Sequence, residues 1–167
     1  MEVLTIDGKA RENNRLEFKK AKGGLPNSLF ETYSAFSKAK GGVIYLGLEE
    51  LQDHTVVSAM LSEEEIDKLK TDLFCLLNDP KKVSANLIAE DDVRVLEYDG
   101  YPLLAIKVNP APREWRPVFI NNNILTGSYR RNDEGDYHCT PSEIRAMLRD
   151  AEEKSEDLRI LNGDGRA

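Results

Sequence analysis

The apolar run from Val43 to Leu48, which follows Gly41 and Gly42, is the feature that most constrains the fold. An apolar stretch without polar residues at alternate positions predicts a central strand that is buried on both faces. Such a strand needs neighbours within a sheet and other elements over each face of that sheet. The rest of the chain therefore has to provide further strands and the helices that cover them.

Three motifs mark the beginnings of helices. Ser28–Glu31, Ser62–Glu65 and Thr140–Glu143 each match the capping box, in which the hydroxyl accepts a hydrogen bond from a first-turn amide and the glutamate reaches back. The first helix should end at Gly41 and the second near Asn78. The apolar residues that follow at helical spacing are Leu29, Tyr33 and Phe36, then Ile66, Leu69, Leu73 and Leu76, and finally Ile144, Met147 and Leu148.

Further strands are predicted at Leu16–Lys19, at Val83–Ile88, and on both sides of the turn dipeptide Asp99-Gly100. In the first of these strands, alternation places Leu16 and Phe18 inward and Glu17 and Lys19 on the other face. Together the elements predict an α+β fold with a mixed sheet of about five strands and three main helices. The two strands of the Asp-Gly hairpin are Val93–Tyr98 and Tyr101–Val108.

The chain of 167 residues is long enough for one domain, which we place at residues 10–150. Residues 151–167 are charged and then glycine-rich, so we expect a disordered tail there. No apolar run approaches the roughly 20 residues that cross a bilayer, and the N-terminus lacks the features of a signal peptide. We therefore expect a soluble, cytoplasmic protein with no membrane partner.

The charges are segregated along the chain. The net charge is −7 and the pI about 5.0, which argues against a protein that coats nucleic acid nonspecifically. Residues 11–40 nevertheless hold seven basic and three acidic side chains, and residues 107–131 hold five basic and one acidic. If these segments are neighbours in space, one face of the protein is basic. The alternative is that they are ordinary solvated charges.

Two sets of residues are candidates for function. Glu12, Glu17, Glu49 and Lys19 form an acidic cluster that two neighbouring strands can present together, as a phosphate, metal or nucleic-acid site. A second set can contact phosphates, and Tyr129 and Trp115 can stack on bases, although Trp115 can equally be a core plug beneath its loop. The basic residues of the second set are Lys19, Lys20, Lys22, Lys38 and Lys40 in one strip and Arg113, Arg116, Arg130 and Arg131 in another.

Four segments, in this order and spacing, resemble the Schlafen AlbA-type domain over roughly residues 10–150. They are Glu12–Lys19, the stretch from Ser34-Ala35-Phe36 to Gly41-Gly42, the strand Ile44–Gly47, and the block from Gly127 to Ile144. The resemblance implies two functions. Similar bacterial domains occur in transcriptional regulators, ahead of a winged helix, and are described as DNA-binding. The similar domain of animal Schlafen proteins cleaves structured RNA through three metal-binding acidic residues.

Carried over to this chain, the resemblance places the metal-binding acids at Glu12, Glu17 and Glu49 and the accompanying base at Lys19. The chain departs from the family at Ser37–Lys40, where Ala-Asn-Thr is usual, and at Glu49, where an aspartate is expected. In the nuclease, Mg²⁺ or Mn²⁺ would be held by carboxylate oxygens, and two such ions can clamp the attacking and leaving oxygens. Without the metal, Glu17 and Lys19 would form a surface ion pair.

We therefore expect a nucleic-acid-binding regulatory module with DNA or RNA as its partner, for which the sequence indicates no cofactor beyond Mg²⁺ or Mn²⁺ in the nuclease alternative. The first alternative is a metal-dependent nuclease acting on structured RNA or DNA. The second is an ATP-binding domain, with phosphate near Asn27–Leu29, or a protein-interaction or oligomerisation domain. A homo-oligomer and a downstream winged-helix domain in a longer bacterial regulator are also expected.

Overall fold

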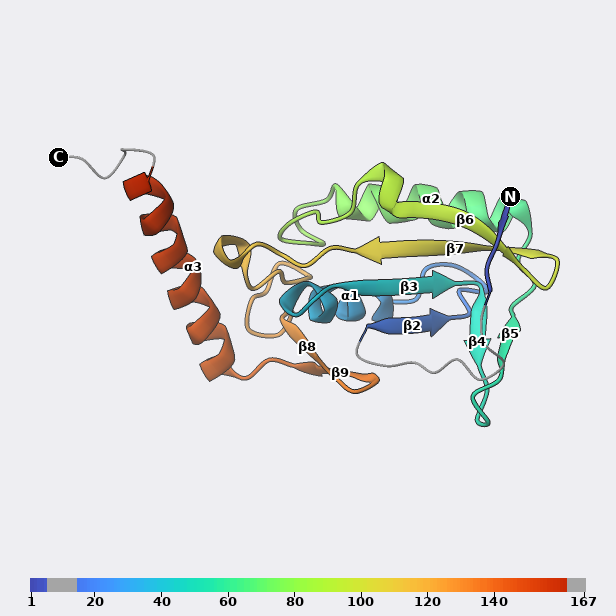
Figure 1. Cartoon of the computed structure of the whole chain (residues 1–167), viewed down its shortest axis with the longest axis horizontal. Coiled ribbons are helices and arrows are strands. Elements are labelled where there is room, and N and C mark those ends of the chain that lie inside the picture. The colour runs from blue at the N-terminus through green and yellow to red at the C-terminus, as the bar shows by residue number, and fades with distance from the viewer. Residues whose placement is uncertain (6–14, 162–167) are drawn as a thin grey trace.

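The computed structural model describes residues 1–5 and 15–161, with side chains up to Glu156. A five-stranded mixed sheet forms its centre, and two short hairpins and three helices surround it (Figure 1). The α+β prediction is thus confirmed. Across the sheet, the strands are β1 (Glu2–Val3), β6 (Val93–Tyr98), β7 (Tyr101–Val108), β3 (Gly42–Leu46) and β2 (Leu16–Lys19). The helices are α1 (Ser28–Lys38), α2 (Glu63–Leu77) and α3 (Pro141–Leu161).

The hairpins and single turns complete the fold. One hairpin pairs β4 (Leu48–Glu50) with β5 (Val56–Ser58), and the other pairs β8 (Tyr129–Asn132) with β9 (Gly135–His138). Two 3₁₀ turns are η1 (Glu90–Asp92) and η2 (Arg113–Trp115). Within the central sheet, β1 runs parallel to β6 and β2 parallel to β3, whereas β7 is antiparallel to both of its neighbours.

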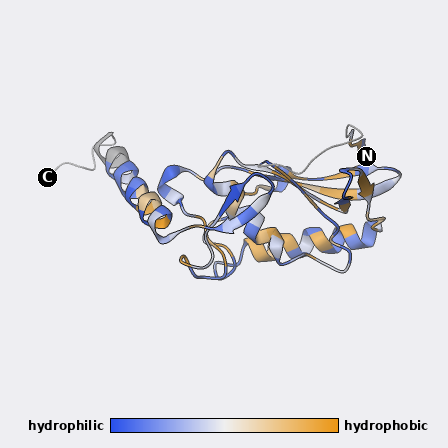
Figure 2. Ribbon diagram, turned by 90° about the horizontal axis from the view of Figure 1, so that it is seen from below, coloured by the Kyte–Doolittle hydropathy of each residue, from blue (hydrophilic) through white to orange (hydrophobic). Residues whose placement is uncertain are grey.

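The sheet separates two hydrophobic cores. The larger core packs α1 and α2 against one face, which includes Ile44, Leu46 and Ile106. The smaller core lies on the opposite face around Phe18 and Leu103, where the β4–β5 hairpin covers one end. Figure 2 shows hydrophobic residues in the strands and along α2, whereas α3 becomes mainly hydrophilic beyond its base. The helices therefore protect one face of the sheet more completely than the other.

The predicted central strand is divided at Gly47. β3 ends at Leu46, and the next strand, β4, belongs to a separate hairpin. Gly47 has φ +104°, a left-handed backbone conformation that turns the chain out of the sheet. The prediction of a single strand over Val43–Leu48 was therefore wrong, because the hydrophobicity of a segment does not show where a glycine bends its backbone.

The predicted strand at Val83–Ile88 was also wrong, since this segment makes only one bridge, between Val83 and Ile120. Tyr33 of α1 satisfies the backbone instead, because its hydroxyl donates to the Ala85 carbonyl at 2.5 Å and accepts from the Leu87 amide at 2.9 Å. The fifth strand is β1, whose two residues are too few to produce a recognisable pattern.

Two of the three predicted capping boxes are present, at Ser62 and Thr140. The third is not, because the residue that precedes α1 is Asn27 and no side chain caps that helix. The Ser28 hydroxyl accepts a hydrogen bond from Lys19 Nζ at 3.0 Å. A residue expected to begin a helix thus links that helix to β2.

The third helix continues to Leu161, so the chain is helical through most of the segment expected to form a tail. Figure 1 shows α3 extending away from the sheet. Its base is held by the buried side chain of Ile144 and by Asp150, which accepts hydrogen bonds from Arg113 of η2. None of the helices in the described ranges has the length and apolar character to span a membrane.

Candidate nucleic-acid interface

Arg131 lies at the centre of a buried ionic cluster. Its Nη1 donates to Glu17 Oε2 at 2.8 Å and to Asp136 Oδ1 at 2.9 Å. The side chain of Arg131 is 1% exposed, and those of both carboxylates are 11% exposed. Thr32 of α1 donates to the other oxygen of Asp136 at 2.6 Å. The cluster therefore joins β2, α1 and the β8–β9 hairpin.

Burial and pairing act in opposite directions on these groups. Burial raises the pKa of Glu17, and the hydrogen bond from Arg131 offsets part of that rise. Burial disfavours the charged guanidinium of Arg131, but the bonds to Glu17 and Asp136 prevail and raise the pKa of Arg131. Since a buried charge without a partner is costly, each member depends on the others for its ionised form.

Lys19 lies on the same face of β2 as Glu17 and points toward α1, where it donates to Ser28. Burial lowers the pKa of Lys19, and the negative charge of Glu17 opposes this. The expected surface ion pair of Glu17 and Lys19 is therefore replaced by separate contacts, in which Glu17 binds Arg131 and Lys19 binds Ser28. Both groups are directed inward, against the helix.

Two of the three acids expected to hold a metal, Glu17 and Glu49, lie within the described ranges. Glu12 lies outside the described residues. Glu17 is held by Arg131, and Glu49 forms an ion pair with Lys20 at 3.2 Å. Residues 1–5 and 15–156 contain no group of three His, Cys, Asp or Glu side chains that could hold an ion. Each of the two described carboxylates is therefore bound by a cation, and a metal site that includes Glu12 stays a prediction.

The lysines expected to form one strip lie at the two ends of α1. Lys20 and Lys22 precede the helix, where they pair with Glu49 and Glu65. Lys38 and Lys40 lie at its other end, and eleven helical residues span about 16 Å. The second pair therefore belongs spatially with the arginines of the C-terminal half.

Around the C-terminal end of α1, several basic side chains come together. Lys38 and Arg130 both approach the carboxylate of Glu143, at 3.9 and 3.4 Å. Arg113 pairs with Asp150, and Arg116 donates to the Ala111 carbonyl at 2.9 Å. Arg131 does not contribute to this surface, because its side chain is enclosed in the ionic cluster.

The two aromatic candidates differ in their surroundings. Trp115 is 51% exposed, so it is not a core plug and its indole remains accessible on η2. Tyr129 is partly buried, and its ring packs against that of His138 with centroids 4.5 Å apart. Of the two, Trp115 presents the larger accessible aromatic surface.

Three basic residues surround the beginning of β3, and sequence patterns singled out only one of them, Lys40. Lys107 pairs in register with Val43 across β7 and β3, and Arg15 Nη2 approaches the Lys40 carbonyl at 3.5 Å. All three side chains are exposed. We call Arg15, Lys40 and Lys107 the β3 basic group. The charge of Lys107 at an alternate position of an otherwise apolar strand was the signal that could have identified it.

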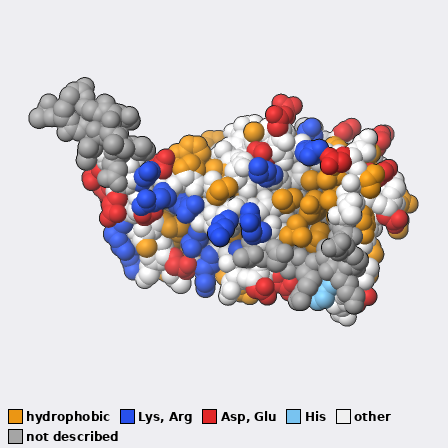
Figure 3. All heavy atoms as spheres, viewed as in Figure 1, with side chains coloured by type: hydrophobic (Ala, Val, Ile, Leu, Met, Phe, Trp, Pro, Cys, Tyr) orange, Lys and Arg blue, Asp and Glu red, His pale blue; other side chains and the backbone are white. Residues whose placement is uncertain are grey.

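Figure 3 shows Lys and Arg side chains gathered mainly between the base of α3 and the beginning of β3. More of the Asp and Glu side chains lie toward the opposite end of this face. The segregation of charge along the sequence is therefore also a segregation in space, which concentrates positive potential at one end of the molecule.

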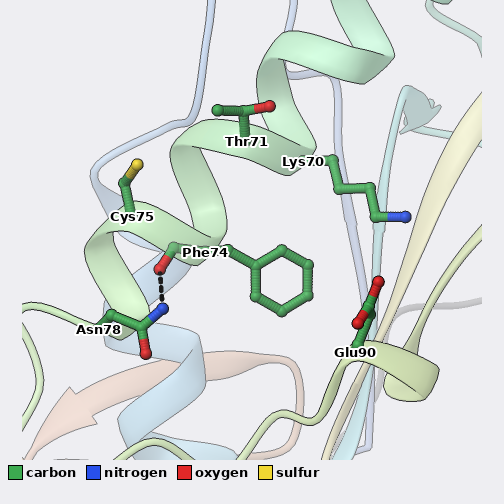
Figure 4. A pocket seen from close by; sticks show the side chains of 6 residues that line it. All are labelled: Lys70, Thr71, Phe74, Cys75, Asn78 and Glu90. Carbon is green, nitrogen blue, oxygen red and sulfur yellow. Dashed lines mark hydrogen bonds between the residues drawn. The ribbon is translucent and has the colours of Figure 1, made fainter.

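A pocket of about 510 Å³ lies elsewhere, between α2 and η1. Figure 4 shows the Phe74 ring on the side of Lys70 and Glu90, whereas Cys75 points away from it. One cation and one carboxylate frame an apolar floor, and no cluster of like charges is present among the lining residues. The pocket thus has little in common with the basic surface.

Two solved structures share the fold. The N-terminal domain of a protein from Nitrosomonas europaea related to the ATP-dependent DNA helicase RecG is 24% identical, with a TM-score of 0.56 over 78% of this chain and 86% of that chain. The DIP2311 protein from Corynebacterium diphtheriae is 17% identical, with a TM-score of 0.54 over 87% of this chain and 26% of that chain. The present chain thus corresponds to about a quarter of the second protein.

A comparison with curated proteins gave no match. The family model described as Schlafen, AlbA_2 matches residues 12–140, which is most of the chain. The match begins at the acidic residue that opens the first motif and ends at the cap of α3, so it includes α1, every strand of the central sheet except β1, and the β8–β9 hairpin. The chain therefore belongs to the Schlafen AlbA_2 family, whose domains are associated with nucleic acids.

Proposed function

We propose that this domain is a regulatory nucleic-acid-binding module whose contact surface is centred on the β3 basic group. The observation that carries the proposal is that Lys40 and Lys107 are both exposed and that neither forms an ion pair within the described residues. Cations that are not neutralised by the protein are available to phosphates. The chain has a net charge of −7, so most of its surface repels phosphates. The end of the molecule that carries the β3 basic group is where phosphates are attracted.

The neighbouring cations extend this surface. Arg113 and Arg130 are at least partly exposed, although each already pairs with a carboxylate, and Trp115 lies two positions after Arg113 in the sequence. All four of these paired cations, Arg113, Arg130, Lys20 and Lys22, contribute less than Lys40 and Lys107, because acidic partners already neutralise them. DNA is the first ligand to test, since a structurally similar domain comes from a protein related to a DNA helicase. Structured RNA is the second, because of the family to which the chain belongs.

The test is fluorescence anisotropy with a labelled DNA duplex and a labelled RNA hairpin at 50 and 200 mM salt. If the three residues of the β3 basic group contact phosphates, affinity for the duplex should fall roughly 40-fold between these salt concentrations. The double substitution Lys40→Gln and Lys107→Gln should weaken binding at low salt and reduce the salt dependence.

Lys68→Gln is the matched control. Lys68 lies on α2, which covers the other face of the sheet, and its side chain is 74% exposed. This substitution should leave affinity and salt dependence unchanged. Affinity that is insensitive to salt, or equal losses in the control and the double variant, would contradict the proposal.

A further inference from the structure

The face of the sheet opposite α1 and α2 carries an unusual row of side chains. Phe18 of β2, Tyr45 of β3 and Ala105 of β7 lie side by side in register. Two residues away along β3 and β7, Val43 pairs in register with Lys107. Because side chains alternate between the two faces of a strand, all five project to the same side. We call this surface the open face.

The open face is covered less completely than the helical face. Ile44, Leu46 and Ile106, which point toward the helices, are fully buried. Val43 and Tyr45 on the open face remain partly exposed, and the charged Lys107 is exposed. An apolar surface that borders solvent and cations in this way is suited to a ligand that has both flat apolar groups and negative charges.

Tyr45 is the aromatic centre of the open face. Its ring stacks on that of Phe18, with centroids 5.7 Å apart and 17° between the planes. Its neighbour on the other side is Ala105, whose single methyl group covers far less of an aromatic ring. The Tyr45 hydroxyl makes no hydrogen bond to another described residue, so it can still donate to a ligand. Phe18 thus fixes the ring while part of it stays accessible.

Cations lie on both sides of this aromatic centre. Lys107 is two positions from Ala105 along β7, about 7 Å away, and Arg15 and Lys40 lie at the beginning of β3. On the far side, Arg94 of β6 pairs in register with Ala105 and contacts Glu2. A chain with regularly spaced phosphates can therefore follow the strands while a base reaches Tyr45.

We propose that the open face binds single-stranded nucleic acid, with one base stacked on Tyr45 and the adjoining phosphates on Lys40 and Lys107. The inference rests on the proposed function and adds the strandedness of the ligand. In a duplex, the faces of the bases are already stacked on one another, whereas a single strand can turn a base outward. Charge supplies the attraction, and the aromatic ring selects the unpaired form.

The experiment compares labelled oligothymidine and oligouridine with a DNA duplex and an RNA hairpin by anisotropy at constant salt. Tyr45→Leu keeps an apolar side chain but removes the aromatic face, and should weaken single-strand binding roughly 5- to 100-fold. Duplex binding should stay within about 2-fold of the wild-type value. Tyr45→Phe should restore single-strand binding to within about 2-fold.

Tyr101→Leu is the matched control, because Tyr101 is a 39% exposed tyrosine at the beginning of β7, beside the Asp99-Gly100 turn and away from the β3 basic group. It should bind single strands as the wild type does. A second measurement does not depend on any variant folding: photocrosslinking of wild-type protein to a bromouridine-containing strand, followed by peptide mapping. The crosslinked peptide should contain Tyr45, and a crosslink only to another segment would overturn the inference.

The outcomes separate the inference from the proposed function. If Lys40→Gln with Lys107→Gln abolishes binding while Tyr45→Leu has no effect on single strands, the open-face inference is wrong and the basic surface stands. Tighter binding of duplexes than of single strands would likewise overturn the inference and leave the basic surface in place. If the wild-type protein binds neither form of DNA or RNA, both fail.

Discussion

Arg131 is the residue on which the junction of β2, α1 and the β8–β9 hairpin depends. Replacing it by leucine would leave the carboxylates of Glu17 and Asp136 buried without their cation. We expect Arg131→Leu to lower the free energy of unfolding by about 3–5 kcal/mol. Urea denaturation measures this difference.

The adjacent Arg130 provides the comparison. Arg130 pairs with Glu143 while its side chain is 41% exposed, so Arg130→Leu should cost at most about 1 kcal/mol. If both variants lost the same free energy of unfolding, burial would not explain how much the Arg131 cluster contributes to stability. A larger loss for Arg130→Leu would contradict the proposed role directly.

Glu17 makes the stability of the cluster depend on pH. Burial raises the pKa of Glu17 in the folded protein above its ordinary value of 4.5. As pH rises through this ordinary value, the unfolded chain loses the proton first, so ionisation favours unfolding until the folded pKa is passed. The contribution of Glu17 to the free energy of unfolding should therefore decline with pH between these two values.

Glu17→Gln should remove this decline, because glutamine does not titrate. Urea denaturation of both proteins at intervals above pH 4.5 gives the two profiles, and their difference isolates Glu17. A difference that grows in favour of the wild type as pH rises would show that pairing with Arg131 outweighs burial, contrary to the direction of the shift.

Individual residues could be selected from the sequence better than their partners could. Glu17, Lys19 and Arg131 were all candidates, but the sequence pattern placed Arg131 in a phosphate-binding strip. Its partner Glu17 lies 114 positions away, and no local pattern predicts contact over that separation. The role of Ser28 was mispredicted for the same reason. Its hydroxyl was expected to cap α1 but accepts a hydrogen bond from Lys19, which lies on another element.

At the level of elements, Gly47 separates β3 from β4. Its φ is +104°, and an added Cβ would lie 3.1 Å from Leu61 Cδ1. Gly47→Ala therefore meets both backbone strain and crowding, and we expect a loss of about 1–3 kcal/mol in the free energy of unfolding. Gly100→Ala is the control, because Gly100 has φ +81° but open space around it.

Thermal or urea unfolding of the two alanine variants separates strain from packing. Gly100→Ala should report the backbone contribution alone, and Gly47→Ala should lose more stability. If Gly47→Ala were the less destabilised variant, the division of the apolar run would not depend on this glycine.

The elements that sequence patterns predicted are those stabilised by local contacts. The Asp99-Gly100 turn has two left-handed residues, with φ 54° and 81°, and joins β6 to β7 as expected. The cap of α2 at Ser62 also involves only neighbouring residues. Val83–Ile88, in contrast, obtains its hydrogen bonds from Tyr33 on another element, which no local pattern can reveal.

Across the whole molecule, topology decides which charges become neighbours. The sequence predicted a basic face from residues 11–40 and 107–131, and both segments do contribute to the β3 basic group. The predicted strips were divided differently, because α1 places Lys20 and Lys38 at opposite ends. In the sheet, β3 pairs in parallel with β2 and antiparallel with β7. These two pairings bring Arg15, Lys40 and Lys107 together.

The attachment of α3 gives the last prediction. Beyond its base, this helix extends from the sheet (Figure 1). The Arg113 guanidinium that holds the helix lowers the pKa of Asp150 by hydrogen bonding. Asp150→Asn removes the charge that binds η2, so amide hydrogen exchange in α3 should accelerate a few-fold while α1 and α2 keep their protection. Glu153→Gln, an exposed site on the same helix, should change nothing. Faster exchange throughout the domain in Asp150→Asn would mean instead that α3 and the sheet open together as one cooperative unit.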